Sequence, residues 1–503
     1  MKVSLKWLNE LIPIKSSLED LIEKLTDLGL ECSSSNLGPS FDKVIIGKVL
    51  KVEKHSNSDH LSLCDVDIGD KDSIQIVCGA PNVKNGIYVP VALVGASLDN
   101  GNFKIKKTKI RNEESNGMIC SEKELDIGED HSGIMILEDK LIPGTSFKEY
   151  LNLEEDVLID FDLTPNRGDC LSFLGIAREV GILNSEHHDN LTKRVIKDNS
   201  FEILRNKNKI NSQISVEIEN EESCPIYLGQ IINDIKVGES PDWLKEKLNS
   251  LSMKSINVVV DLANYIMLMV GQPMHVFDFD KLPNKKIKVG YPEKKKSLIT
   301  LDSVERKLSN NNLLIKDSNT PIAIAGVMGG KNTEVDKNTK NIFIESAIFD
   351  PIVIRKSAKG VDLSTDASKR FERSVDSSMA EIALDLLSGL IIKYSGGEAS
   401  SDIIKLDTSS KNQNKVSFNV DKCNQFLGTN LAKTDIDSIF DKVNIDFKMT
   451  KDTYNCIAPS YRSHDIKRDV DLYEEVARVW GYNKIENSSN FSIDYNMINL
   501  DNF

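Results

Sequence analysis

The chain has 503 residues, of which 40% are hydrophobic and 28% charged, and its formal net charge is −14. This length predicts roughly three or four domains, and the acidity counts against nucleic-acid binding without excluding it, because binding needs only a local positive stripe. With no apolar run long enough for a bilayer, no secretory signal and no C-x-x-C pair among the eight cysteines, we expect a cytoplasmic protein with reduced thiols.

The first predicted elements are a short helix and a small barrel. Leucine and isoleucine recur at helical spacing in residues 16–30, where Ser17 is the expected N-cap and Gly29 the expected end. Between residues 44 and 137, about five short β-rich runs are separated by Gly, Asn and Asp, and the last of them is GIMIL at 133–137. Short strands in this arrangement favour an OB-type barrel.

The middle of the chain alternates helical and β patterns. A helix is expected from about Cys170 to Leu183, with Asp169 as a possible N-cap, and a polar linker over residues 187–211. Residues 214–398 then combine helical patterns with short apolar strands, which predicts an α+β domain. The helical patterns of this block lie at 243–251, 257–269 and 378–394.

The C-terminal part is predicted to form one more small domain. A second polar linker occupies residues 401–414, and residues 415–486 form a mixed α/β pattern that ends in the helical segment DVDLYEEVARVWGY. Residues 487–503 are rich in Ser, Asn and Asp, and we expect a frayed tail.

A basic stripe lies in the predicted barrel of this acidic chain. Its members are Lys104, Lys106, Lys107, Lys109 and Arg111. An OB barrel with a basic rim commonly follows a nucleic-acid backbone, although a strand with a solvated lysine face has the same pattern.

A second candidate site follows an apolar helix. His275 comes just after a Gly-Gln-Pro turn, and Gly329, Glu345 and the segment GVDLSTDASKRF follow at strand ends and loops. A lone histidine is more often structural than catalytic, and no phosphate-binding G-x-x-x-x-G-K-[ST] loop is present.

The last helix carries a cluster of acids. Asp471, Glu474 and Glu475 stand at i, i+3 and i+4 on one helix face, with Asp465 in the lead-in. Such carboxylates can hold Mg²⁺, but acids also favour the positive end of a helix dipole, and Glu474 can pair with Arg478.

Several of these segments resemble the β subunit of bacterial phenylalanine–tRNA ligases. The phrase LTPNRGDCLSFLGIAREVGIL at residues 163–183 carries the resemblance most specifically. The barrel resembles the tRNA-binding OB domain of several synthetases, with motifs H-P-N-A-D-x-L and K-x-R-x-x-x-S-x-G-M-I-C-S. The matching residues are His55, Asn57, Asp59, Leu61, Lys109, Arg111, Ser115, Gly117, Met118, Cys120 and Ser121; Ser56, Ser58 and Asn112 depart from the motifs, and Met269 stands where the family usually has Glu.

The resemblance implies a multidomain α+β fold. Its parts would be a split N-terminal B1-type α/β domain (1–38 and 151–186) with an inserted OB-fold β-barrel (39–150), an α+β editing domain of the B3/B4 type (212–400) and a small mixed B5 domain (415–486). Residues 487–503 would begin a synthetase-like domain that this chain lacks.

The same resemblance implies what the chain does. The whole enzyme would join phenylalanine to its tRNA with ATP bound by an α subunit, while this subunit would hydrolyse tyrosine wrongly attached to tRNA(Phe). The implied editing residues are His275, Gly329, Glu345, Thr365 and Ala367, with Glu345 on the tyrosine phenol and His275 on the ester or its attacking water. Asp465, Asp471, Glu474 and Glu475 would hold Mg²⁺ shared with the α subunit.

The expected partners are tRNA(Phe) and the α subunit, in the α₂β₂ assembly of the family, with no membrane or DNA partner. Two alternatives stay open: a free-standing hydrolase that clears mischarged tRNA, and a tRNA-binding module without chemistry of its own.

Overall fold

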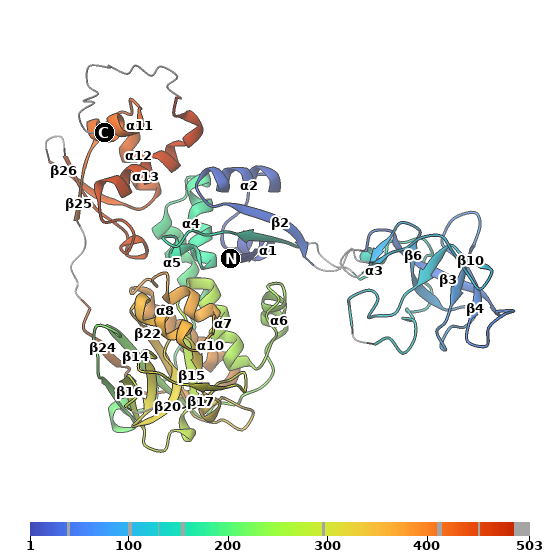
Figure 1. Cartoon of the computed structure of the whole chain (residues 1–503), viewed down its shortest axis with the longest axis horizontal. Coiled ribbons are helices and arrows are strands. Elements are labelled where there is room, and N and C mark those ends of the chain that lie inside the picture. The colour runs from blue at the N-terminus through green and yellow to red at the C-terminus, as the bar shows by residue number, and fades with distance from the viewer. Residues whose placement is uncertain are drawn as a thin grey trace, which may run out of the picture. The chain divides into compact units, whose positions relative to one another are not determined.

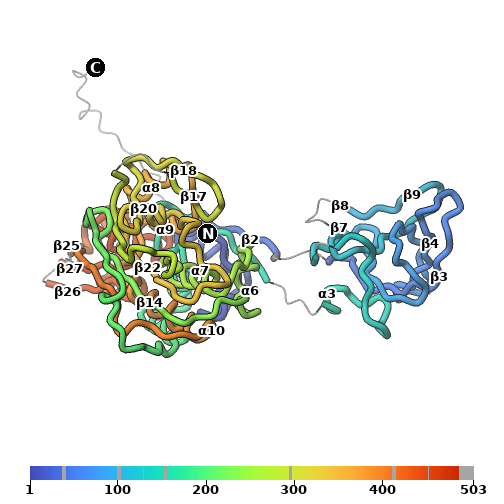
Figure 2. The backbone as a smooth tube through the Cα atoms, turned by 90° about the horizontal axis from the view of Figure 1, so that it is seen from below, coloured from blue at the N-terminus to red at the C-terminus, as the bar shows by residue number. Residues whose placement is uncertain are grey.

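The structure is a computed structural model, and it describes residues 1–37, 41–98, 103–128, 130–151, 156–293, 297–409, 415–450 and 453–486 (Figure 1). The chain divides into two compact units: residues 36–157 form one, and residues 1–35 with residues 158–503 form the other. The backbone of each unit can be followed in Figure 2. The predicted tail at 487–503 lies outside the described residues.

The unit of residues 36–157 is a curled antiparallel sheet with strand order β11-β6-β3-β4-β5. A register shift between Val49 and Lys51 bends β3, which pairs with both β4 and β6. The two edge strands meet where the Asn116 N–H donates to the Gln75 carbonyl at 2.9 Å. The sheet therefore nearly closes into the barrel expected from the sequence. Its strands are β3 (Val44–Lys54), β4 (Ser62–Asp67), β5 (Ile74–Cys78), β6 (Tyr88–Leu93) and β11 (Gly117–Ile119).

One predicted strand of this barrel is wrong. Residues 133–137 form no strand, and β11 takes that place in the sheet. Ile134 and Leu137 are still buried, and the Leu137 N–H donates to the Tyr88 carbonyl at 2.8 Å. The apolar residues of this segment thus cover the barrel as an extended loop without joining a ladder. The remaining elements of the unit are β7 (Ser97–Leu98), β8 (Phe103–Lys104), β9 (Thr108–Ile110), β10 (Glu113–Ser115) and α3 (Phe147–Tyr150).

The second unit begins with a small sheet of strand order β1-β12-β2 that is covered by helices. The predicted first helix is confirmed as α2, whose N-cap Ser17 accepts from the Asp20 N–H at 3.2 Å. The helix predicted near residue 170 begins later, because Ser172 caps it and not Asp169. These elements are β1 (Lys2–Ser4), α1 (Leu5–Leu11), α2 (Leu18–Asp27), β2 (Cys32–Leu37), β12 (Asp156–Phe161), η1 (Gly168–Cys170) and α4 (Phe173–Asn184).

Both predicted linkers contain regular structure. Residues 187–211 include helix α5 (His188–Asn199), which buries Leu191 and Val195 at i, i+4 spacing. Residues 401–414 include β24 (Ile404–Asp407), whose Ile404 is buried as the strand pairs with β14 (Ile226–Asn233). In each segment, a few apolar residues at the spacing of a helix or a strand are enough to form that element, although most of the segment is polar. Residues 410–414 lie outside the described part of the chain.

The central region is a layered α+β domain. In the sheet β15-β22-β14-β23, alternate residues of β14 face opposite layers: Ile226 and Leu228 pack with helices α7 and α10, while Tyr227 and Ile231 face the second sheet, β13-β16-β19-β20-β21. The helices predicted at 243–251, 257–269 and 378–394 are confirmed as α6, α7 and α10.

The strands of this region are β13 (Ser215–Ile218), β15 (Met274–Asp278), β16 (Lys286–Gly290), β17 (Ser297–Ile299), β18 (Glu305–Lys307), β19 (Leu314–Asp317), β20 (Thr320–Ile324), β21 (Met328–Gly329), β22 (Ile342–Ile348) and β23 (Glu398–Ala399). Its helices are α6 (Asp242–Asn249), α7 (Val258–Val270), α8 (Pro351–Gly360), α9 (Asp366–Phe371) and α10 (Met379–Ser395), with short 3₁₀ turns η2 (Ile210–Ser212), η3 (Phe279–Lys281) and η4 (Lys331–Thr333).

The C-terminal region is a small mixed domain with sheet order β25-β27-β26. Phe418, Phe440 and Tyr454 pack edge to face in its core. Its elements are β25 (Lys415–Asn419), α11 (Val420–Leu427), α12 (Lys433–Lys442), β26 (Asp446–Thr450), β27 (Thr453–Ile457), η5 (Ser460–Arg462), α13 (Asp469–Trp480) and η6 (Tyr482–Lys484).

A buried charge cluster joins this C-terminal domain to α4. Arg478 on α13 contacts Glu179 on α4 at 2.7 Å and Glu475 at 2.5 Å. Arg167 contacts the other oxygen of Glu179 at 2.5 Å, and Arg462 contacts Glu475 at 2.7 Å. We call this set the charge cluster; its members are Arg167, Asp169, Glu179, Arg462, Asp465, Glu475 and Arg478.

The two buried glutamates of the charge cluster, Glu179 and Glu475, have pKa values below their usual range. Burial alone would raise the pKa of Glu475, but Arg462 and Arg478 outweigh it and hold the pKa below its usual range. A carboxyl group with a lowered pKa in the folded state stabilises the fold above the ordinary glutamate pKa. That stabilisation is lost as the pH falls through the lower, folded-state value.

We expect Glu475→Gln to destabilise the chain by about 3–5 kcal/mol, because it leaves two buried arginines without a full counter-charge. The measurement is urea unfolding followed by tryptophan fluorescence, since Trp480 ends α13. The matched control is Glu381→Gln, which removes an exposed pair with Lys405 and should change the midpoint little. Equal shifts for the two variants would contradict the structural role of the charge cluster.

Candidate functional site

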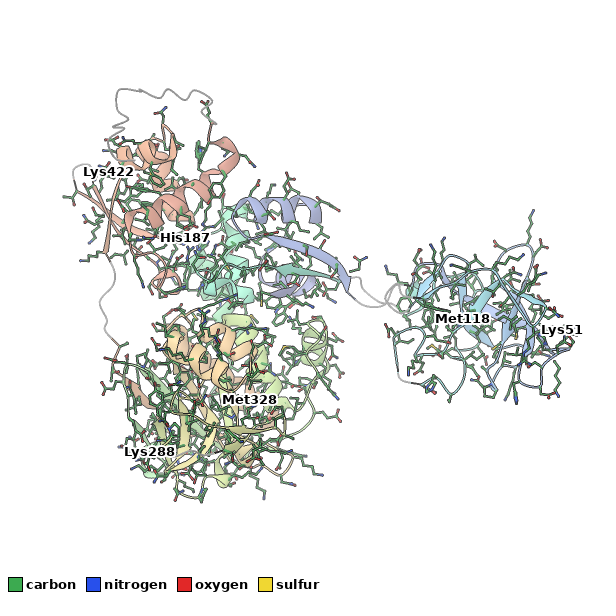
Figure 3. All side chains as sticks on the ribbon, viewed as in Figure 1. Lys51, Met118, His187, Lys288, Met328 and Lys422 are labelled. Atoms are coloured by element: carbon green, nitrogen blue, oxygen red, sulfur yellow. The ribbon has the colours of Figure 1, made fainter. Side chains whose placement is uncertain are left out.

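A pocket of about 410 Å³, counting its open mouth, lies between the two sheets of the central domain. β15 and β22 supply one wall, β20 and β21 the opposite wall, and α9 closes one side. Figure 3 marks Met328 of β21, one of the lining residues. The lining is mainly apolar and includes Ile324, Val327, Met328, Ala347 and Phe371.

Glu345 supplies a buried carboxyl group to this apolar pocket. It is 5% exposed, and its Oε2 accepts a hydrogen bond from the Tyr227 hydroxyl at 2.7 Å. Burial raises the pKa of Glu345 to about 7, and the hydrogen bond from Tyr227 opposes that rise. The carboxyl group therefore changes its charge near neutral pH, which is typical of functional groups in clefts.

His275 stands directly opposite Glu345 on the neighbouring strand, because β15 and β22 pair antiparallel with these two residues in register. Burial lowers the pKa of His275 to about 4, so its ring is neutral at physiological pH. The ring meets Phe277 edge to face, with centroids 4.4 Å apart. A neutral imidazole can accept a hydrogen bond from water or a hydroxyl group at the pocket.

Gly329 lies against the Cε1–Nε2 edge of the His275 ring. A Cβ atom at position 329 would come within 2.3 Å of His275 Cε1 and 2.5 Å of Nε2. A side chain at this position would therefore displace the imidazole or fill the pocket.

Ala367 lines the pocket from α9, whereas Thr365 does not. Thr365 is the N-cap of α9, accepting from the Ser368 N–H at 3.1 Å, and its hydroxyl donates to the Val327 carbonyl at 2.8 Å. Thr365 thus ties α9 to a wall of the pocket. Of the five editing residues expected from the sequence, four meet at the pocket and the fifth supports it.

The sequence did not single out Tyr227, although it bonds to Glu345. Within the run IYLGQII it has the pattern of a core aromatic residue, and its side chain is fully buried. Only the pairing of β14 with β22 brings it to Glu345. Met269, where the family usually has Glu, is buried in the helix core and does not line the pocket.

The two barrel motifs predicted from the sequence meet in space. His55 Nε2 lies 3.2 Å from the Ile110 carbonyl, and Arg111 donates to the Asn57 carbonyl at 3.1 Å. Arg111 and Asn112 have φ of 49° and 79°, so they form the left-handed turn between β9 and β10. Asn112 replaces the usual Gly at a position that Gly favours and that Asn tolerates.

The basic stripe lies on β8, on β9 and on the loops around them, with all five side chains exposed. Lys107 pairs with Glu114 at 2.9 Å, so part of its charge is already balanced.

The four predicted magnesium ligands do not converge into one site within the described residues. Asp465 and Glu475 both contact Arg462, and Asp471 accepts from the Arg468 side chain and from two backbone N–H groups near the start of α13. Glu474 is the exposed member, and burial together with Glu475 and Asp465 raises its pKa. Because arginines already contact three of the four carboxylates, the set does not form a closed metal site by itself.

One other group of ligand-type side chains is close enough for an ion in the described part of the chain: Asp169, Cys170 and Glu179. Arg167 contacts all three, at 2.5–3.0 Å, and so occupies the position of a cation. Among the described helices, none is both long and apolar enough to span a bilayer.

Three family models match the chain. They are a putative tRNA binding domain over residues 44–146, a B3/4 domain over residues 223–396, which contains the pocket, and a tRNA synthetase B5 domain over residues 416–482.

Curated relatives match almost the whole chain. A phenylalanine–tRNA ligase beta subunit of Fusobacterium nucleatum subsp. nucleatum is 40% identical over 97% of this chain and 60% of the relative. The corresponding subunit of Protochlamydia amoebophila is 41% identical over 96% of this chain and 60% of the relative. A solved N-terminal fragment of the phenylalanyl-tRNA synthetase beta subunit from Pyrococcus horikoshii covers 95% of this chain and 99% of that chain, with 14% identity and a TM-score of 0.38.

A tRNA-binding barrel combined with B3/4 and B5 domains defines a subunit of an aminoacyl-tRNA synthetase. Because the matches extend over nearly the whole of this chain, it belongs to the family of phenylalanine–tRNA ligase β subunits. It spans about 60% of the length of the curated relatives that it matches.

We expect Gly329→Ala to lower the unfolding free energy by about 1–3 kcal/mol, because the new methyl group overpacks against His275. The control is Gly238→Ala, where a Cβ atom would meet nothing within 4 Å. Thermal unfolding of both variants measures the difference. If Gly329→Ala unfolds at the same temperature as the wild type and its His275 ring does not move, the contact between residue 329 and His275 is less tight than in the structure.

Proposed function

We propose that this chain serves in the attachment of phenylalanine to its tRNA and that its own reaction is hydrolysis of tyrosine wrongly attached to that tRNA. The observation that carries the proposal is the acceptor oxygen of Glu345 in an otherwise apolar pocket. A pocket built for phenylalanine rejects a ring with one more hydroxyl only weakly. A second pocket that offers the hydroxyl a buried acceptor discriminates strongly.

The roles follow from the positions of the side chains. The tyrosine ring would lie between the apolar walls with its hydroxyl donating to Glu345. His275, neutral and beside Gly329, would accept a hydrogen bond from the attacking water. Water adds to the ester carbonyl carbon, the bond to the ribose oxygen breaks, and that oxygen leaves with a proton, giving free tyrosine and tRNA.

The basic stripe would bind the tRNA backbone, since phosphate contacts supply most non-specific affinity. The ligase activity of the whole enzyme, ATP on an α subunit, the α₂β₂ assembly and a cytoplasmic location are proposed from the family alone. Magnesium at the acidic helix stays a prediction, and metal content of the chain bound to an α subunit is its measurement.

We expect the purified chain to hydrolyse Tyr-tRNA(Phe) in the presence of an α subunit, and Glu345→Gln to lower kcat/KM by about 10-fold or more. The reason is that the variant replaces an ionised acceptor by a neutral amide. Phe-tRNA(Phe) hydrolysis is the control, because it lacks the hydroxyl and should not depend on Glu345.

The alternatives give other results. Activity that needs no α subunit under any condition supports a free-standing hydrolase. Retention of tRNA without hydrolysis, and no effect of His275→Ala, supports a binding module without chemistry.

We expect the combined variant Lys106→Ala, Lys109→Ala and Arg111→Ala to weaken tRNA binding by about 10-fold or more at low salt and to flatten its salt dependence. Filter binding over a salt series measures both. The control combines Lys71→Ala, Lys84→Ala and Lys123→Ala, three exposed lysines of the same unit. Equal losses in the two sets would mean that net charge, and not the basic stripe, binds the tRNA.

A further inference from the structure

We infer that Tyr227 is a positioning residue for the proposed proofreading reaction: it occupies one oxygen of Glu345 and leaves the other as the acceptor for the ring hydroxyl of the substrate. The inference rests on the proposed function and deepens it, because it states how a single carboxyl group recognises a hydroxylated ring.

The backbone brings the two side chains together diagonally. Gly229 of β14 is the direct cross-strand neighbour of Glu345, and Tyr227 stands two residues earlier on the same face. Gly229 has no side chain to contact Glu345, and the Phe343 ring fills the space where its Cβ would lie, at 2.5 Å. Tyr227 is therefore the residue of β14 that reaches the carboxyl group.

The two oxygens of Glu345 have different surroundings. Oε2 accepts from the Tyr227 hydroxyl at 2.7 Å, and Tyr227 itself is fully buried and does not line the pocket. Within the described residues, no side chain or backbone N–H is found to donate to Oε1, while Glu345 does line the pocket. The hydrogen bond from Tyr227 thus fixes the orientation of the carboxyl group through Oε2. Oε1 remains available as an acceptor for a substrate in the pocket.

Tyr227 also bears on the charge of Glu345. The groups that face Glu345 are Tyr227 from β14, His275 from β15 and Cys224, which precedes β14. Burial raises the pKa of both Tyr227 and Cys224 well above their usual values and lowers that of His275, so all three are neutral at pH 7. Among the described residues, Tyr227 is the group that opposes the rise in the pKa of Glu345.

The charge of Glu345 sets the expected pH dependence of the activity. Below its pKa of about 7, Glu345 is protonated, and its remaining oxygen no longer offers the substrate a charged acceptor. Without the Tyr227 hydroxyl the pKa rises further, so a smaller fraction of Glu345 is ionised at neutral pH. Activity on the hydroxylated substrate should then recover only at higher pH.

The test is Tyr227→Phe, which removes one oxygen atom and keeps the ring. We expect kcat/KM for Tyr-tRNA(Phe) to fall by about 10-fold at pH 7 and to approach the wild-type value at pH 8.5, with Phe-tRNA(Phe) hydrolysis unchanged. Glu345→Gln should show no such pH dependence, because its amide does not titrate.

The matched control is Tyr454→Phe. Tyr454 is also fully buried and donates to a carboxylate, Asp437 at 2.8 Å, but it lies in the C-terminal domain. The Tyr454→Phe variant therefore measures how much stability is lost with such a hydrogen bond, and it leaves the pocket unchanged. A uniform loss of activity for Tyr227→Phe at every pH, in step with its melting temperature, would overturn the inference in favour of a structural role.

A direct titration separates this inference from the proposed function. If the wild-type chain hydrolyses no Tyr-tRNA(Phe), the proposed function fails, and infrared difference spectra against Glu345→Gln still report the pKa of the carboxyl group. An upward shift in Tyr227→Phe supports the positioning role independently of activity. An unshifted carboxyl pKa overturns it.

Discussion

Three buried arginines join the C-terminal domain to helix α4 within the larger unit of this chain. Arg167 and Arg478 both contact Glu179 of α4, and Arg462 and Arg478 both contact Glu475 of α13. Residues nearly three hundred positions apart in the sequence therefore depend on shared counter-charges. Because an unpaired charge in this setting costs several kcal/mol, the C-terminal domain and α4 are constrained to one relative arrangement.

The same network engages two of the carboxyl groups that were predicted to bind magnesium. Asp465 and Glu475 both contact Arg462, so a metal that took these oxygens would weaken the pairing of that arginine. The carboxyl group in the pocket has no such arginine partner among the described residues. Glu345 has a neutral partner, Tyr227, and no buried cation is found beside it in the described residues, which is why its pKa rises while that of Glu475 falls.

The sequence predicts local structure well where the apolar residues of a segment repeat at a single regular spacing. The spacing of apolar residues predicts α2, α6, α7 and α10, and Ser17 caps the helix that it was expected to cap. Prediction fails where a few residues override composition: Leu191 and Val195 make a helix in an apparent linker, and residues 133–137 have the composition of a strand but no partner to pair with.

The candidate site depends on pairing that no local pattern contains. His275, Gly329, Glu345 and Ala367 come from four elements, and spacing alone gives no reason to join them; the family resemblance does. The family resemblance did not point to Tyr227, and a tyrosine in an apolar strand has the pattern of a core residue. Its role becomes visible only through the register of β14 against β22.

The strands that flank the barrel have an implication for how such a chain arose. In the sheet β1-β12-β2, the Glu31 carbonyl accepts from the Asp162 N–H at 2.9 Å, just before β2 and just after β12, so these neighbours run antiparallel. Topologically, the whole barrel occupies the place of a hairpin loop. An insertion between two such strands leaves their shared ladder in place, because the strands pair with each other whatever the length of the connection.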